Sequence, residues 1–188
     1  MLLESLIISV LIGILRGGRL SSLKELQFKG LYLVFLSLLI EYLLYYLITG
    51  YDFMNQQIVF FIVLVQYFLL FLFAWLNKRY RYDWLLGLGI FLNFLVICFN
   101  MGSMPVSSKI VDLDGVSKKF ILLKENKLFT YHILNDSTKL SFLGDILYIP
   151  FPYRQFISFG DILLVLGIFF IIQNAMLGKR KYPEEIHS

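Results

Sequence analysis

An aspartate-bearing tetrapeptide that occurs twice is the part of this sequence best suited to do chemistry. Gly-Asp-Ile-Leu stands at Gly144–Leu147 and again at Gly160–Leu163, and two prolines lie between the copies. A chain that turns at these prolines could bring Asp145 close to Asp161. Neighbouring carboxylates can separate their pKa values and work as acid and base, and His132 would add a titratable ring. These three residues form a candidate catalytic set.

The second copy also has a structural explanation. Ser158 precedes Asp161 by three residues, ahead of an apolar run, which is the spacing of a helix capping box with Asp in place of the more usual Glu. The carboxylate would also lie at the positive end of the helix. Asp145 lacks this frame, because Ser141 precedes it by four residues. Two interpretations of Asp145 stay open: a solvated residue of an interfacial turn, or an inward-facing member of an outer pocket.

Other polar residues fall within or beside the apolar runs. A charge in the middle of a membrane span costs at least about 2.5 kcal/mol, so Glu41 should face inward and be partnered or protonated. Asn93, Asn100 and Gly102 are candidates to line a ligand pocket together with Glu41. The alternative for the amides is hydrogen bonding between helices, worth about 0.6 kcal/mol each. His132 is expected on a short helix at the membrane surface, where a structural role competes with a catalytic one.

Several common kinds of site are missing from the sequence. It has no Gly-rich phosphate loop, no recognisable Ser/His/Asp order and no His/Glu metal doublet. The single cysteine, Cys98, excludes an intrachain disulfide and a cysteine-based metal site. With only two histidines in the chain, we expect neither a metal nor a cofactor.

The elements that must position these residues are membrane spans. The 188-residue chain is 59% hydrophobic and 16% charged, with a mean hydropathy of +0.75, whereas soluble proteins are about 45–50% apolar and about 25% charged. The net charge of +4 comes from basic residues between apolar runs, where lipid headgroups explain it without nucleic acid. The composition predicts a single integral membrane domain over residues 1–188.

The apolar runs predict an all-α bundle of about five transmembrane helices, at residues 2–15, 30–49, 56–76, 84–99 and 159–177. The first run covers only about 21 Å of a roughly 30 Å hydrocarbon core. Its small residues recur at every fourth position and predict close packing with another helix: Ser5, Ser9, Gly13 and Gly17. Gly89 and Asn93 in the fourth run, and Gly160 and Gly167 in the fifth, predict helix faces that meet. Residues 100–158 should form an extracytoplasmic cap of short interfacial helices and turns.

The distribution of basic residues predicts the orientation. Lys and Arg number four in residues 16–29, three in residues 77–83 and three after residue 177, whereas residues 50–55 have none. Short basic loops stay in the cytoplasm. We therefore expect a multi-pass protein of the bacterial plasma membrane, with its N-terminus outside and its C-terminus in the cytoplasm.

Five stretches together resemble a bacterial family of small integral membrane proteins classed only as a domain of unknown function. They are "VLIGILRGGRL" (residues 10–20), "NMGSMPV" (residues 100–106), His132, "STKLSFLGD" (residues 137–145) and "SFGDILLVLGIF" (residues 158–169). The family often has a glycine after the asparagine of "NMGSMPV", where this chain has Met101. The resemblance implies a topology and no reaction.

Three functions remain open at this point. The first is a binding or accessory protein whose cap meets a lipid, an amphipathic ligand or a membrane partner, with a homo-oligomer as one form of partner. The second is a membrane-embedded enzyme that acts on a lipid-linked substrate at the outer leaflet through Asp145, Asp161 and His132. The third is a small transporter that uses Glu41. The missing catalytic motifs favour the first.

Overall fold

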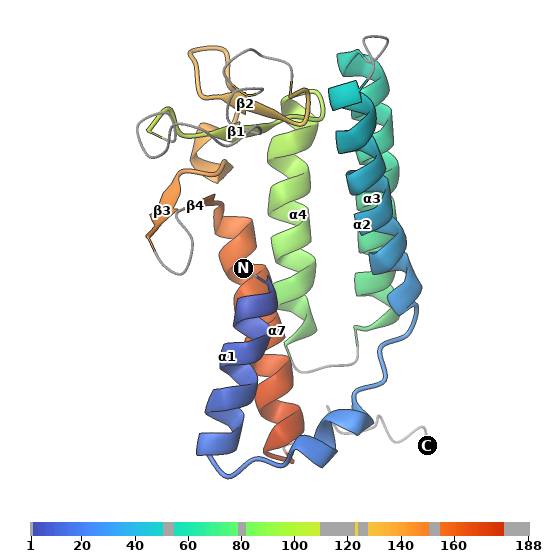
Figure 1. Cartoon of the computed structure of the whole chain (residues 1–188), viewed down its shortest axis with the longest axis vertical. Coiled ribbons are helices and arrows are strands. Elements are labelled where there is room, and N and C mark those ends of the chain that lie inside the picture. The colour runs from blue at the N-terminus through green and yellow to red at the C-terminus, as the bar shows by residue number, and fades with distance from the viewer. Residues whose placement is uncertain are drawn as a thin grey trace, which may run out of the picture.

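The computed structural model describes residues 2–50, 55–78, 82–109, 123, 128–150 and 155–178, and it is mostly helical (Figure 1). The α-helices with described bounds are α1 (Leu2–Leu15), α2 (Leu31–Gly50), α3 (Gln56–Leu76), α4 (Asp83–Phe99) and α7 (Phe159–Met176). Three of them, α2, α3 and α7, are long and apolar enough to cross a membrane, and α1 and α4 are shorter apolar helices. Every bound lies within one residue of the predicted run.

Helices α1 and α7 run side by side in the same direction. Ser5 Oγ donates to Val165 O at 3.2 Å, and four residues later Ser9 Oγ donates to Phe169 O at 3.0 Å. Gly13 then packs against the side chain of Met176. The small-residue face predicted for the first run is confirmed for these three positions, because each lets the backbones approach closely.

Gly17 does not belong to that face. No atom lies within 4 Å of the position its Cβ would take, and its φ of +80° is left-handed. Gly17 N donates to Ile14 O and Gly18 N donates to Gly13 O, which is the pattern of a Schellman motif. The packing prediction was therefore wrong for Gly17, because the helix ends at Leu15, two residues before it, and the glycine supplies the turn.

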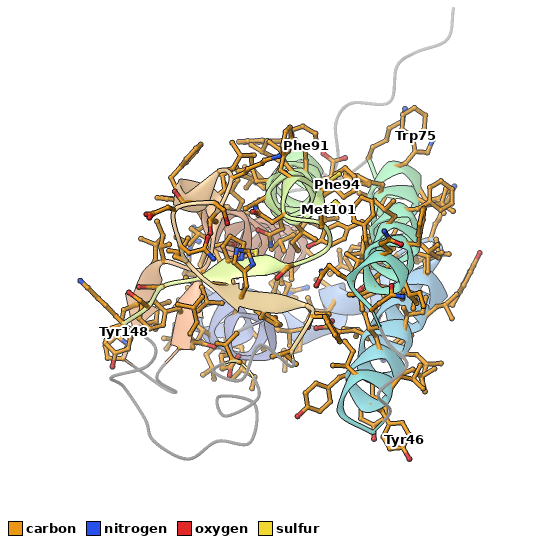
Figure 2. All side chains as sticks on the ribbon, turned by 90° about the horizontal axis from the view of Figure 1, so that it is seen from above. Tyr46, Trp75, Phe91, Phe94, Met101 and Tyr148 are labelled. Atoms are coloured by element: carbon orange, nitrogen blue, oxygen red, sulfur yellow. The ribbon has the colours of Figure 1, made fainter. Side chains whose placement is uncertain are left out.

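The remaining helices form an antiparallel series in which α3 packs against both α2 and α4. Leu44, Ile48, Val59 and Val63 make the buried contact between α2 and α3. Phe94 of α4 lies against two rings of α3, with centroids 5.5 Å from Tyr67 and 5.3 Å from Phe71 (Figure 2). Helix α4 also packs along α7, so it joins the α2–α3 pair to the α1–α7 pair.

The basic links meet at one end of this bundle. The link after α1 includes a short 3-10 helix, η1 (Leu20–Glu25). Asn77, the C-cap of α3, exchanges hydrogen bonds with both backbone groups of Lys29, at 2.9 Å and 2.8 Å. Arg19 N donates to Met176 O at 3.0 Å. The end of α7 and the two basic links therefore lie at the same end of the bundle.

Among the described residues of the cap at the other end, the regular elements are mainly short strands where short helices were predicted, and the predicted turns are present. Strands β1 (Met104–Val106) and β2 (Tyr131–Ile133) pair in parallel, and strands β3 (Leu147–Ile149) and β4 (Gln155–Ile157) pair antiparallel. A short 3-10 helix, η2 (Ser141–Leu143), precedes β3. The apolar runs here are only a few residues long, and periodicity cannot distinguish a strand from a helix at that length.

Candidate functional site

The polar centre beneath the cap is built around the start of α7. Ser158 is the N-cap residue, and its Oγ accepts from Asp161 N at 2.9 Å while Ser158 N donates to Asp161 Oδ2 at 3.2 Å. The capping box predicted from the spacing is confirmed. Asn93 of α4 closes this pair into a ring, because its Nδ2 donates to Asp161 Oδ1 at 2.9 Å and its Oδ1 accepts from Ser158 Oγ at 2.7 Å.

Two glycines allow the ring to form. A Cβ on Gly160 would collide with the Asn93 amide, and it would lie 2.8 Å from Gly89 O. A Cβ on Gly89 would lie 2.7 Å from Gly160 O and 2.8 Å from the side chain of Leu164. Helices α4 and α7 therefore touch through backbone at this level, and the predicted meeting of their glycine and asparagine faces is confirmed.

His132 lies on β2 rather than on the predicted interfacial helix. Its Nδ1 lies 2.8 Å from Ser103 Oγ and its Nε2 lies 3.2 Å from Thr138 Oγ1. The Thr138 hydroxyl donates to Asn135 Oδ1, so it accepts from Nε2–H, and Nδ1 accepts from Ser103. Burial lowers the pKa of His132, which favours this neutral ring.

Asp145 occupies a different setting from Asp161, although the two tetrapeptides are identical. Its backbone continues the cap sheet: Asp145 N donates to Pro105 O at 2.8 Å, and Ser107 N donates to Asp145 O at 3.0 Å. Its Oδ1 is closed off from solvent. The residue as a whole is half-buried. One carboxylate oxygen is shielded, and both interpretations of Asp145 stay predictions.

Tyr131 is a member of the centre that the sequence did not reveal. Burial raises the pKa of the Tyr131 phenol, and the negative charges of Asp145, Glu41 and Asp161 raise it further, in that order. The phenol therefore stays neutral and lies within electrostatic range of all three carboxylates. Alternation of side chains along a strand could have pointed to Tyr131, because it places Tyr131 and His132 on opposite faces of β2. The strand itself was not predicted, so this signal could not be used.

Asn100 and Gly102 shape the end of α4 and its junction with the cap. Asn100 Nδ2 donates to Lys139 O at 2.8 Å and Asn100 Oδ1 accepts from Lys139 N at 3.0 Å. Gly102 has a φ of +89°, and a Cβ there would lie 2.8 Å from Phe60 Cα. Both residues thus have structural roles that explain their residue types, because each contacts backbone atoms of a distant segment.

Glu41 was predicted to face inward, and this expectation is only half right. Its Oε2 accepts from Gln66 Nε2 of α3 at 3.4 Å, yet the side chain is exposed. The physical reason is that α2 packs mainly against α3. Because Glu41 lies at the edge of the α2–α3 contact, α3 covers one side of its side chain and leaves the other side exposed.

The arrangement offers little freedom for acid–base chemistry. Both ring nitrogens of His132 and both carboxylate oxygens of Asp161 are engaged in hydrogen bonds within the protein. The Asp161 oxygens accept from the backbone of Ser158 and from the amide of Asn93, so neither oxygen is free to take a proton from a substrate. Within the described part of the chain, no group of three or more His, Cys, Asp or Glu side chains could hold a metal ion. Asp145, whose negative charge raises the pKa of the Tyr131 phenol, is the remaining carboxylate with catalytic potential.

Comparison with known proteins adds a family and no activity. No curated protein and no solved structure matches the chain. One family model matches residues 25–173, from the last residue of η1 to the last turn of α7, and it is described as a family of unknown function. The chain therefore belongs to the family of unknown function DUF5317.

Proposed function

We propose that this protein crosses the bacterial plasma membrane five times, with its N-terminus outside and its C-terminus in the cytoplasm, and works by binding rather than by catalysis. The helix directions support five crossings, since α1, α3 and α7 run one way and α2 and α4 run the other. All three basic segments then fall on the cytoplasmic side. The short α1, with 14 residues, is accommodated by local thinning of the bilayer.

Aromatic residues support the same placement. At the basic end, Trp75 is exposed and Lys78 Nζ lies 4.0 Å from its ring centroid. Trp84 is also exposed and opens α4 next to the second basic link. Tryptophan and lysine are typical of a membrane–water interface. Exposed Leu, Ile, Val and Phe side chains cover the outer faces of the helices between the two ends, as contact with lipid requires.

The engagement of His132 and Asp161 in structural hydrogen bonds is the observation that carries a binding function. A general base must reach a substrate proton, and these groups are already committed to cap and helix contacts. The cap is in turn fixed to the bundle through Asn100 and through Gln56, whose Nε2 donates to Met101 O at 2.7 Å and Phe129 O at 3.1 Å. A fixed cap presents one constant surface to a lipid, an amphipathic ligand or a membrane partner.

A membrane-embedded enzyme is the second candidate. It is favoured by the solvent-shielded Asp145 Oδ1, because the charge of Asp145 acts on the Tyr131 phenol. The test reconstitutes purified protein with a total lipid extract of its host and follows the lipid masses with time. It also records the native mass of the gently extracted protein. Binding predicts unchanged lipid masses and a retained bound species.

Two results would contradict the binding proposal. One is conversion of a lipid that is lost in Asp145→Asn and kept in Asp136→Asn, a matched change at an exposed aspartate, which would favour the enzyme. The other is a native mass that equals the bare chain under every mild extraction. Transport through Glu41 has less support, because within the described part of the chain its carboxylate accepts one long hydrogen bond, 3.4 Å from Gln66.

A further inference from the structure

The helices of the bundle do not all begin at the same depth on the cap side. The N-cap of α7, Ser158, bonds Asn93, which lies seven residues before Asn100 at the end of α4. At 1.5 Å per residue, α7 therefore starts about 10 Å below the end of α4. Helix α3 starts level with the end of α4, because Gln56 bonds Met101 O.

Helix α1 shares the low start of α7. Ser5 bonds Val165, so Leu2, three residues earlier, lies near the level of residue 162. On the cap side, the ends of α1 and α7 therefore lie about 10 Å lower than the ends of α3 and α4. A bilayer that matches α3 and α4 would extend above α1 and α7 on this side, unless something else in the protein meets it.

The β3–β4 hairpin occupies that level. Strand β4 ends at Ile157, directly before Ser158, and Ile157 pairs with Leu147 of β3. The hairpin thus starts where α7 starts. Figure 1 shows β3 and β4 beside the upper end of α7, below the β1–β2 pair. The upper part of the cap, in contrast, is level with the end of α4, where Lys139 pairs with Asn100.

Aromatic side chains cover this low part of the cap. Tyr148 of β3 is 41% exposed and pairs across the strands with Phe156, with ring centroids 5.5 Å apart. Phe142 in η2 is 58% exposed, and Phe159 at the start of α7 is 44% exposed. Figure 2 shows Tyr148 pointing away from the bundle. Rings with a polar tip favour the level of the lipid headgroups.

We propose that the β3–β4 hairpin is embedded in the outer leaflet, where the Tyr148–Phe156 pair contacts lipid. This inference rests on the proposed membrane arrangement. Lipid is the occupant because Figure 1 shows the hairpin above the level of α1 on the same side of the molecule, and α1 exposes an apolar face that includes Leu6, Ile7 and Leu11. The strands satisfy part of their backbone through each other, and the outer leaflet supplies headgroups and water for the rest.

The experiment places a single tryptophan in the hairpin. Tyr148→Trp is introduced with Trp75→Phe and Trp84→Phe, which removes both native tryptophans. The full chain is reconstituted in phosphatidylcholine vesicles whose acyl chains carry bromine either near the headgroup or near the methyl end. The matched control is Asp136→Trp in the same background, at an exposed position three residues before Lys139. Phe142→Trp repeats the measurement if Tyr148→Trp fails to elute as a monodisperse species.

We expect the hairpin tryptophan to emit at shorter wavelength than the control and to lose intensity in lipids brominated near the headgroup. The control tryptophan should lose none. Equal quenching at both positions, or no quenching in the hairpin, would overturn the inference. Blue-shifted emission that neither brominated lipid nor aqueous acrylamide quenches would also overturn it, in favour of a protein partner. The unmodified protein tests the arrangement itself: if Trp75 and Trp84 escape quenching as well, the proposed membrane placement fails too.

Discussion

At the scale of single residues, the turn after α4 places strain on a residue that is not glycine. Met101 has a φ of +55°, which is left-handed, and it is the C′ residue of a Schellman motif in which Gly102 N donates to Ile97 O at 2.9 Å. This conformation costs an L-residue about 1–2 kcal/mol, and the entropy that glycine loses on folding offsets about 0.5–1 kcal/mol of it. Met101→Gly should therefore stabilise the protein by about 0.5–1 kcal/mol.

Gly102→Ala is the matched opposite. Its φ of +89° is left-handed as well, and its Cβ would press on the backbone of Phe60, so it should destabilise by at least about 1–2 kcal/mol. Thermal unfolding in detergent micelles measures both changes. A loss of stability in Met101→Gly would show that the methionine side chain contributes more than its backbone costs.

His132 should make stability depend on pH. Because burial lowers its pKa in the folded state, the unfolded chain, with a histidine pKa of about 6.5, binds the proton more readily. The contribution of the neutral His132 ring to the free energy of unfolding is complete above about pH 6.5. It is lost as the pH falls below that value towards the lower pKa of the folded state. Melting temperatures between about pH 7.5 and about pH 5.5 should fall in the parent and fall less in His132→Gln.

The other histidine provides the control for this effect. His187→Gln should keep the parent's dependence on pH in the same window. If His132→Gln shows the full dependence as well, the proton that destabilises the fold binds elsewhere.

Residue types and spacing could predict part of the polar centre. The capping box needs only local spacing, so Ser158 and Asp161 were found from the sequence. The position of Asp145 in the cap depends on its pairing with Val106, a residue 39 positions away, and no local pattern encodes that pairing. Tyr131 was missed for the same reason, since its face follows from an unpredicted strand.

At the scale of elements, contact between α4 and α7 depends on one glycine and not on its neighbour two residues away. Gly89 meets Gly160 O and Leu164, whereas nothing lies within 4 Å of a Cβ on Gly87. Alanine favours a helix over glycine by about 1 kcal/mol, so Gly87→Ala should be neutral or stabilising. Gly89→Ala should cost about 1–3 kcal/mol, because overpacking forces the helices apart.

The melting temperatures of the two variants test this packing directly. Equal effects would mean that α4 and α7 do not touch through backbone. The hydrogen-bonded ring offers an independent check, since separated helices should also expose the Asn93 amide to hydrogen exchange.

Elements differed in how well the sequence predicted them. The helices follow from long apolar runs with clear ends, and their bounds agree within one residue. In the described part of the cap, the prediction of short helices was wrong for four segments that form strands. These strands of three residues gain their stability from pairing with distant segments and from packing on α4 through Val96, Met104 and Leu143. Composition also cannot reveal the double role of Asn77 and Asn100. Each is the C-cap of a helix, and its side-chain amide forms two hydrogen bonds with the backbone of a lysine far away in the sequence.

At the scale of the whole molecule, two groups of helices are joined through α4 at different depths. The α2–α3 pair and α4 reach the upper cap, and the α1–α7 pair ends lower, beneath the β3–β4 hairpin (Figure 1). Basic links lie at one end and the polar centre lies at the other. This separation means that the orientation in the membrane decides which compartment the cap faces, and with it any partner that the cap binds.

Cysteine labelling on intact cells tests that orientation and the number of crossings together. Cys98→Ser removes the single native thiol, and Ser21→Cys and Ser108→Cys then place one thiol at an exposed position on each side of α2, α3 and α4. An odd number of crossings puts the two thiols on opposite faces. An impermeant maleimide should therefore label residue 108 on intact cells and residue 21 only after permeabilisation. A cysteine appended after Ser188 should behave like residue 21, because α7 crosses once more. Reversed labelling would invert the orientation, and labelling of residues 21 and 108 from the same side would show that one of the three intervening helices does not cross.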